Sequence, residues 1–264
     1  RSARPALLSR VPRSIHVFGG HTVLGMPLNT AERFNPRTER WEVLPPMQTA
    51  RYSSAGAAMG NKLYIAGGNS GQQALDTVEC FDPTVGRWEL VPPMPTARQR
   101  CAAAAAGGRL HVVGGESHCT LAVAERYDPR TQHWEGLPNM LMERTGCAAA
   151  TIADTLYVAG GADSVGHASV ATESFSACSG QWSMLPWMTT AREFCAAAAV
   201  GGRLYVIGGR LSLWGTLATM ESYDPGTCVW SSHPSMPEER SRCAATVSAG
   251  HIYVVGGSDS RYEA

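Results

Sequence analysis

The chain has 264 residues, of which 44% are hydrophobic and 17% are charged, and its formal net charge is +0. This composition supplies a sizeable apolar core and excludes long disordered tails. A neutral chain gives no electrostatic reason to expect nucleic acid or an acidic membrane surface as a partner, and no apolar run reaches the roughly 18 residues of a transmembrane helix.

The N-terminal segment RSARPALLSRVPRS (1–14) is predicted to be a connector or a degenerate first strand, with ALLSRV (6–11) as the candidate strand. Beyond it, glycine pairs recur every 46 to 48 residues, beginning at Gly19, Gly67, Gly114, Gly160, Gly208 and Gly256. The stretches CAAAAAGGRLHVVGG (101–115) and CAAAAVGGRLYVIGG (195–209) are two turns of this period. The glycine pairs end strands and open no helix, so they are not a dinucleotide-binding loop.

Four other residue types keep the same period. Tryptophan recurs at Trp41, Trp88, Trp134, Trp182 and Trp230. An aromatic residue precedes each tryptophan, at Phe34, Phe81, Tyr127, Phe175 and Tyr223, and a glutamate precedes each aromatic, at Glu32, Glu79, Glu125, Glu173 and Glu221. Arginine recurs at Arg51, Arg98, Arg144, Arg192 and Arg240. Five markers on one period indicate a structural repeat.

One unit, taken in chain order, predicts four short strands. They are the alanine-rich segment 101–106, LHVVGG (110–115) after a Gly-Gly turn, AERYDP (124–129), which carries a strand into an Asp-Pro turn, and a last strand at HWEGL (133–137). No helical periodicity accompanies them. An isolated antiparallel sheet leaves its faces exposed, whereas sheets arranged around an axis cover one another, so the pattern predicts an all-β propeller.

This arrangement assigns mechanical roles to the markers. Each tryptophan is expected to fill the gap between neighbouring sheets, and the glycine pairs to occupy crowded positions or positive φ. Alanine is expected to line the narrow hub. The recurring Glu and Arg are expected to form structural ion pairs or backbone hydrogen bonds, because a functional site seldom needs five identical copies.

The pattern of GG, E-x-[FY]-[DN]-P, W and M-x-x-x-R closely resembles the kelch repeat, from about residue 14 to the C-terminus. Repeat four departs from it with FSA (175–177), and NMLMER (139–144) lacks the Pro-Thr-Ala seen in MPTAR (94–98). The resemblance implies one kelch β-propeller over residues 15–264, with repeats at about 15–50, 51–97, 98–143, 144–191, 192–239 and a partial one at 240–264. We expect six four-stranded blades with the last incomplete in this chain; a five-bladed ring with a frayed end is the alternative.

Catalysis and cofactors are not expected. Cys101, Cys147, Cys195 and Cys243 each lie three residues after a repeat arginine, which predicts small buried side chains in separate repeats, reduced as in the cytosol. No paired C-x-x-C clamps or H-x-x-x-H pair indicate a metal site. Kelch-like propellers include copper radical oxidases and iron-dependent specifier proteins, but their ligand constellations are not recognisable here.

The loops after the glycine pairs and those joining successive blades are expected to share one face, and there the sequence departs from its own period. The residue after each glycine pair and the residue two past each repeat arginine vary most. Trp214 also lies outside the period, in a loop with Leu211, Leu213 and Leu217. Because protein interfaces favour Trp, Tyr and Arg, we expect partner-binding residues at Arg100, Phe194, Arg210, Trp214, Arg242, His21 and Asn69.

The resemblance extends to BTB–BACK–kelch proteins, whose propellers present a degron to a cullin-type ubiquitin ligase. It implies a cytoplasmic interaction module that binds a protein or peptide, with the ligase machinery reached through domains outside this chain. Arg100 and Arg242 would then hold an acidic peptide by bidentate pairing. The alternatives are a cytoskeletal scaffold that binds actin and a metal-dependent kelch-like enzyme.

Overall fold

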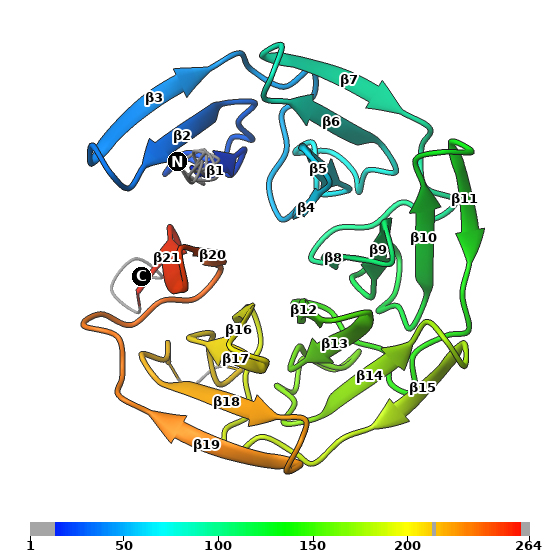
Figure 1. The fold of residues 1–264 in the computed structure, drawn as a ribbon, viewed down its shortest axis with the longest axis vertical. Helices are drawn as coiled ribbons and strands as arrows, with labels where there is room; N and C mark the ends of the chain where they lie inside the picture. Colours follow the sequence, from blue (N-terminus) through cyan, green and yellow to red (C-terminus); the bar gives the residue numbers. More distant parts are fainter. Residues whose placement is uncertain (1–13, 213–214, 260–264) are drawn as a thin grey trace, which may run out of the picture.

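The computed structural model describes residues 14–212 and 215–259, and these residues form 21 β-strands and no helix. The strands make six antiparallel sheets that surround a central axis, as Figure 1 shows. The all-β propeller expected from the period is therefore confirmed.

Each sheet is one blade, and its strands run outward from the hub in chain order. Blade 1 contains β1 (Ile15–Phe18), β2 (Ala31–Asn35) and β3 (Arg40–Leu44), and blade 2 contains β4 (Ala55–Met59), β5 (Lys62–Ala66), β6 (Val78–Asp82) and β7 (Arg87–Val91). Blade 3 contains β8 (Ala102–Ala106), β9 (Arg109–Val113), β10 (Ala124–Asp128) and β11 (His133–Gly136). Blade 4 contains β12 (Ala148–Ile152), β13 (Thr155–Ala159), β14 (Thr172–Ser176) and β15 (Gln181–Met184). Blade 5 contains β16 (Ala196–Val200), β17 (Arg203–Ile207), β18 (Met220–Asp224) and β19 (Val229–His233), and the partial blade 6 contains β20 (Ala244–Ser248) and β21 (His251–Val255).

The periodic tryptophans join neighbouring blades. Trp134 is 6% exposed, and its indole N–H donates to the carbonyl of Pro92 in the preceding blade at 2.8 Å. The same bond runs from Trp88 to Pro45 and from Trp182 to Pro138. The tryptophan therefore fills the gap between sheets, as expected, and also satisfies its one donor there.

The periodic arginines and glutamates form buried ion pairs. Each pair joins the segment before a blade's first strand to its third strand: Arg51–Glu79, Arg98–Glu125, Arg144–Glu173 and Arg192–Glu221, at 2.6–2.8 Å. Every arginine also donates to the carbonyl of the first glycine of its pair, as Arg144 does to Gly160 at 2.8 Å. The glycine pair also lets the backbone of the next repeat approach closely. A Cβ at Gly67 would lie 2.4 Å from the carbonyl oxygen of Arg98, which accepts from the Gly68 N–H at 2.9 Å. The prediction of structural ion pairs is confirmed.

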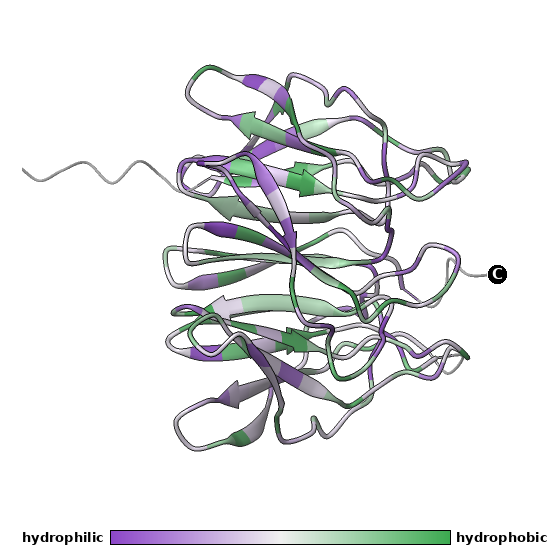
Figure 2. Ribbon diagram, turned by 90° about the vertical axis from the view of Figure 1, so that its right-hand side faces the viewer, coloured by the Kyte–Doolittle hydropathy of each residue, from purple (hydrophilic) through white to green (hydrophobic). Residues whose placement is uncertain are grey.

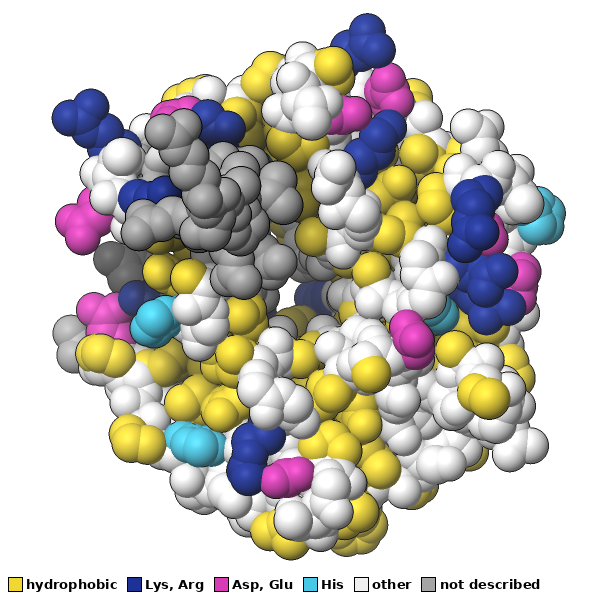
Figure 3. Space-filling view, in the orientation of Figure 1, with side chains coloured by type: hydrophobic (Ala, Val, Ile, Leu, Met, Phe, Trp, Pro, Cys, Tyr) yellow, Lys and Arg dark blue, Asp and Glu magenta, His cyan; other side chains and the backbone are white. Residues whose placement is uncertain are grey.

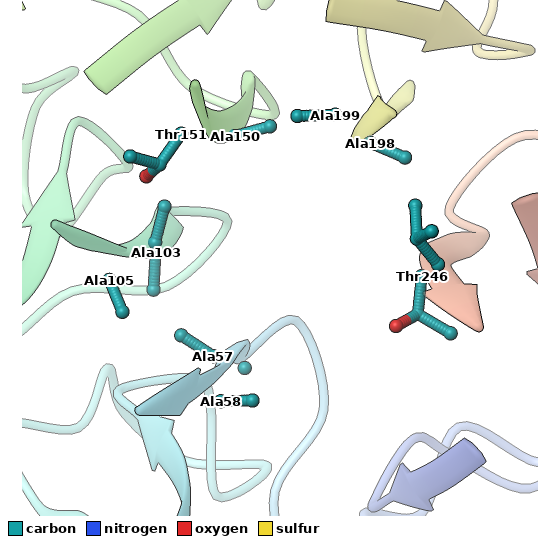
Figure 4. Close-up of a pocket in the computed structure, with 12 residues that line it drawn as sticks. Ala57, Ala58, Ala103, Ala105, Ala150, Thr151, Ala198, Ala199 and Thr246 are labelled. Atoms are coloured by element: carbon teal, nitrogen blue, oxygen red, sulfur yellow. The ribbon is translucent and has the colours of Figure 1, made fainter. Parts of the chain in front are cut away.

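Alanine lines the hub. The innermost strands β4, β8, β12, β16 and β20 surround a channel of about 230 Å³ whose walls include Ala57, Ala103, Ala105, Ala150 and Ala199. Figure 4 shows these short side chains around the opening, with Thr151 and Thr246 as hydroxyl-bearing exceptions. Larger side chains from five blades would not fit at this radius, which explains the alanine-rich first strands.

The two incomplete blades lie beside each other in the ring (Figure 1). Six sheets surround the axis, so the six-bladed expectation is confirmed and the five-bladed alternative is wrong. The candidate strand 6–11 lies outside the described residues. Trp41 of blade 1 is 50% exposed, whereas its equivalents in blades 2, 3 and 4 are buried. Arg240 keeps the bond to Gly256, at 3.0 Å, but its second nitrogen pairs with Glu238 of its own loop.

The turn of repeat four differs as its sequence suggests. In blade 3 the carboxylate of Asp128 accepts from the backbone N–H two residues later, at 2.9 Å. In blade 4 the hydroxyl of Ser176 accepts from the N–H of Ser179, three residues later, at 3.3 Å. A serine can therefore close this turn without the Asp-Pro pair.

His111 occupies the strand position that tyrosine fills in other repeats, and it is 1% exposed. Its pKa falls from 6.5 to about 4, chiefly because burial disfavours the charged imidazolium, and the nearby Arg126 and Arg109 guanidinium groups contribute to the shift. The folded chain therefore holds a neutral imidazole where the unfolded chain binds a proton, so stability is lost as the pH falls through 6.5 toward 4. We expect His111 to account for about 2 kcal/mol of this loss between pH 7 and pH 4.5, measured by denaturant unfolding. His111→Tyr should flatten the profile, and an unchanged slope would contradict the assignment.

Candidate functional site

The loops that follow the glycine pairs and the linkers between blades lie on one face, at the right-hand side of Figure 2. We call it the loop face. The opposite face, seen in Figure 3, carries charged side chains of both signs in scattered groups rather than one continuous field. The shared position of these two sets of loops agrees with the expectation from the repeat.

A chain of backbone hydrogen bonds surrounds the channel mouth on this face. It runs from blade to blade through the residue two past each repeat arginine, with N–H···O distances of 2.7–2.9 Å: Arg100 to Ser53, Gly146 to Arg100, Phe194 to Gly146 and Arg242 to Phe194. All five residues have positive φ, between 50° and 63°. Only one of them is glycine, and a bulky residue such as Phe194 is strained in this conformation.

The ring of Phe194 gathers three arginines. The guanidinium carbons of Arg100, Arg210 and Arg242 lie 5.3, 5.0 and 5.1 Å from its centroid, within the range of cation–π contacts. These arginines come from blades 3, 5 and 6, so Phe194 collects positive charge from half of the ring. We call these four residues the Arg–Phe cluster.

Two glutamates border the Arg–Phe cluster. Glu116 pairs with Arg100 at 3.0 Å and accepts from the hydroxyl of Thr145 at 3.0 Å, while Glu193 pairs with Arg210 at 2.9 Å. The glutamates therefore hold Arg100 and Arg210 in place beside the Phe194 ring.

Gly146 makes room for the cluster. A Cβ at this position would lie 3.0 Å from two carbons of the Phe194 ring. The sequence drew attention to the variable position but did not identify Gly146, Glu116 or Glu193 as site residues. The sequence feature that could have identified Gly146 is its small size, because blades 3, 5 and 6 carry Arg, Phe and Arg at the same position.

Gly146→Ala is expected to displace the Phe194 ring and to lower the free energy of unfolding by about 2 kcal/mol, from the positive φ and the contact together. Gly166→Ala is the control, because Gly166 also has positive φ, at 85°, but nothing lies within 4 Å of a Cβ added there. Its loss should be about 1 kcal/mol. Denaturant unfolding measures both variants, and equal losses would show that Phe194 does not rest on Gly146.

The remaining predicted site residues lie elsewhere. His21 is exposed and packs edge-on against Tyr52, with ring centroids 5.7 Å apart, between blades 1 and 2. Asn69 is half-buried and donates to the Gln99 side chain at 2.8 Å, while its oxygen accepts from the Gly71 N–H. Trp214 lies outside the described residues. The fold therefore brings together Arg100, Phe194, Arg210 and Arg242. It connects Asn69 to them through Gln99, whose amide donates to Glu116 at 3.1 Å, and it leaves His21 beside Tyr52.

The cysteines near the mouth are not arranged as nucleophiles. Burial raises the pKa of the Cys101 thiol to about 11 and those of Cys147 and Cys195 to about 12, so all three stay protonated near neutral pH. Within residues 14–212 and 215–259, no group of three or more His, Cys, Asp or Glu side chains could hold a metal ion. None of the described segments forms a helix with the length and hydropathy needed to cross a membrane.

Comparisons with known proteins agree with this architecture. Residues 1–145 match the family model described as the KLHDC2/KLHL20/DRC7 Kelch-repeats domain, and residues 143–189, 191–237 and 239–263 each match the Kelch motif. The chain is 36% identical over 56 residues to the F-box/kelch-repeat protein At1g67480 of Arabidopsis thaliana, a stretch that covers 21% of this chain and 15% of that protein. A solved structure described as "Structure of YjhT" has a TM-score of 0.78 at 14% identity, covering 95% of this chain and 92% of that one, which is a likeness of fold alone. Because one family model spans more than half of the chain and the Kelch motif matches most of the rest, the protein belongs to the kelch-repeat family.

Proposed function

We propose that the loop face binds a partner protein or peptide, and that the Arg–Phe cluster receives an acidic segment of it. The kelch propeller is a general protein-interaction fold, which supports the coarser half of this proposal. The single observation that supports the finer half is the convergence of three guanidinium groups on Phe194 at the channel mouth.

The chemistry of the Arg–Phe cluster suits an acidic ligand. The planar fork of N–H donors on a guanidinium group matches the geometry of a carboxylate and can bind both of its oxygens. Aromatic and arginine residues also dominate the binding energy of protein interfaces. The strained φ of Phe194 and Arg242 is typical of residues that a structure retains for function.

The broader biological setting belongs to the same proposal. The family resemblance to BTB–BACK–kelch proteins, and the F-box in the name of the Arabidopsis relative, support a non-catalytic role as the substrate-recognition domain of a cullin-type ubiquitin ligase in the cytoplasm. The ligase machinery would be recruited by domains other than this propeller. No contact among the described residues specifically favours the actin-binding alternative.

The test compares partner capture by the wild-type chain with capture by Arg100→Ala/Arg242→Ala. The proposal expects at least about tenfold weaker recovery of specific partners, with an acidic segment shared among those lost. The control is Arg37→Ala/Arg130→Ala, which removes the same charge from two turns remote from the loop face and should leave capture unchanged. Equal recovery by all three proteins would reject the Arg–Phe cluster as the binding site.

A further inference from the structure

The linker between blades 3 and 4 carries large apolar side chains that the repeat does not require. Leu141 and Met142 stand where the other linkers have Gln48-Thr49, Pro95-Thr96, Thr189-Thr190 and Pro237-Glu238. In blade 4 the fold uses only their backbone N–H groups, which donate to Glu173 at 2.6 and 3.2 Å. Thr189 and Thr190 make the same bonds to Glu221. Nevertheless, Leu141 is 55% and Met142 40% exposed.

A small cavity lies beside this linker. It has a volume of about 110 Å³. Met142, Ala162 and Ala168 form its apolar wall, and its polar side consists of Glu143, Arg144, Asp163, His167 and Ser169. The far wall is fixed, because the Ala168 N–H donates to the hydroxyl of Ser212 in the next blade at 2.8 Å. A cavity of this size accepts one aliphatic side chain. We call it the blade-4 pocket.

The blade-4 pocket adjoins the Arg–Phe cluster on its inner side. Ala162 forms an antiparallel bridge with Thr145, which precedes Gly146 under the Phe194 ring. Blade 4 differs from its neighbours at three positions of the repeat: the two residues after the repeat arginine and the residue after the glycine pair. Blade 4 carries Thr, Gly and Ala at these positions, whereas blade 3 carries Gln, Arg and Glu and blade 5 carries Glu, Phe and Arg. These small residues let the side chains of the neighbouring blades meet above blade 4.

The linker between blades 4 and 5 carries an exposed indole near the outer end of the blade-4 loop that contains Ala162 and Ala168. The N–H of Met188 donates to the carbonyl of Val170 at 3.0 Å. This bond holds the linker between blades 4 and 5 against the end of the blade-4 loop. Trp187 immediately precedes Met188 and is 66% exposed. It is not one of the periodic tryptophans that join blades. Large solvent-exposed apolar groups of this kind mark interaction surfaces.

We propose that an extended peptide of the partner lies outward across blade 4, with an acidic residue on the Arg–Phe cluster and a large aliphatic residue in the blade-4 pocket. This inference rests on the proposed function and specifies the partner's chemistry. Trp187 packs against the part of the peptide beyond the pocket. The negative charge of the ligand belongs at the hub end, where the three arginines converge on Phe194.

The experiment selects random twelve-residue peptides displayed on phage against the 264-residue chain and then measures the affinity of the enriched peptides by fluorescence polarisation. We expect enriched peptides to carry an acidic residue at a constant spacing from Leu, Ile or Met. Leu141→Thr/Met142→Thr, which copies the linker of blade 5, should bind them about tenfold more weakly. Val85→Thr, which alters an exposed apolar residue in a turn between β6 and β7, should bind normally.

The outcomes separate the two proposals. If Arg100→Ala/Arg242→Ala abolishes binding while Leu141→Thr/Met142→Thr binds as the wild type does, the path across blade 4 is wrong and the Arg–Phe cluster stands. If neither variant changes the affinity, both proposals fail. If no peptide is enriched, or the enriched peptides lack the aliphatic residue, the blade-4 inference is overturned.

Discussion

Trp134→Ala is expected to lower the free energy of unfolding by about 3–5 kcal/mol, the range for removing a large aromatic side chain from a core. Trp134 packs on Tyr127 of its own blade, with ring centroids 5.3 Å apart, and donates to Pro92 of the preceding blade. Its loss would leave a cavity between blades 2 and 3 and an unpaired carbonyl at its edge. Denaturant unfolding monitored by circular dichroism measures the effect.

Trp41→Ala is the matched control. Trp41 holds the same place in blade 1 and packs on Phe34 at a similar centroid distance of 5.1 Å, but it is 50% exposed. Its replacement should cost about 1–2 kcal/mol. Equal losses for the two variants would show that burial between blades does not stabilise the propeller.

Glu173→Gln is expected to destabilise the chain by about 3–5 kcal/mol, because it leaves the buried Arg144 guanidinium without its counter-charge. Glu173 is fully buried and accepts from Arg144 at 2.6 Å and from the backbone N–H groups of Leu141 and Met142. The glutamine keeps the shape but loses the charge and one acceptor. Thermal and denaturant unfolding both report the loss.

The control for Glu173→Gln is Glu32→Gln, at the same position of blade 1. Glu32 is exposed and forms no ion pair with another described residue. We expect its replacement to change stability by less than about 0.5 kcal/mol, as for an ordinary surface site. A small loss at Glu173 as well would mean that the periodic ion pairs are not structural. A large loss would also connect the linker that carries Leu141 and Met142 to the stability of blade 4.

Most of the fold was predictable from local patterns. The four-strand unit, the indole contacts, the buried Arg–Glu pairs and the alanine hub each recur once per repeat, and repetition exposes what every blade needs. His16 and His111 stand where other repeats carry a strand tyrosine, and they lie in β1 and β9. The candidate site was predictable only as a face and a set of variable positions. Those positions include Gly146 and Glu116, which the composition of interfaces does not favour.

The sequence by itself determined that this protein is a ring of sheets, because each repeat must cover its faces with neighbours and so leaves a periodic mark. Only the tertiary structure decided which variable residues meet. Arg100, Phe194 and Arg242 are separated by 94 and 48 positions along the chain, and the small residues of blade 4 bring them together over the channel mouth. Whether two residues of different blades come into contact depends on the size of the side chains in the blade between them. A local sequence pattern contains no information about that intervening blade.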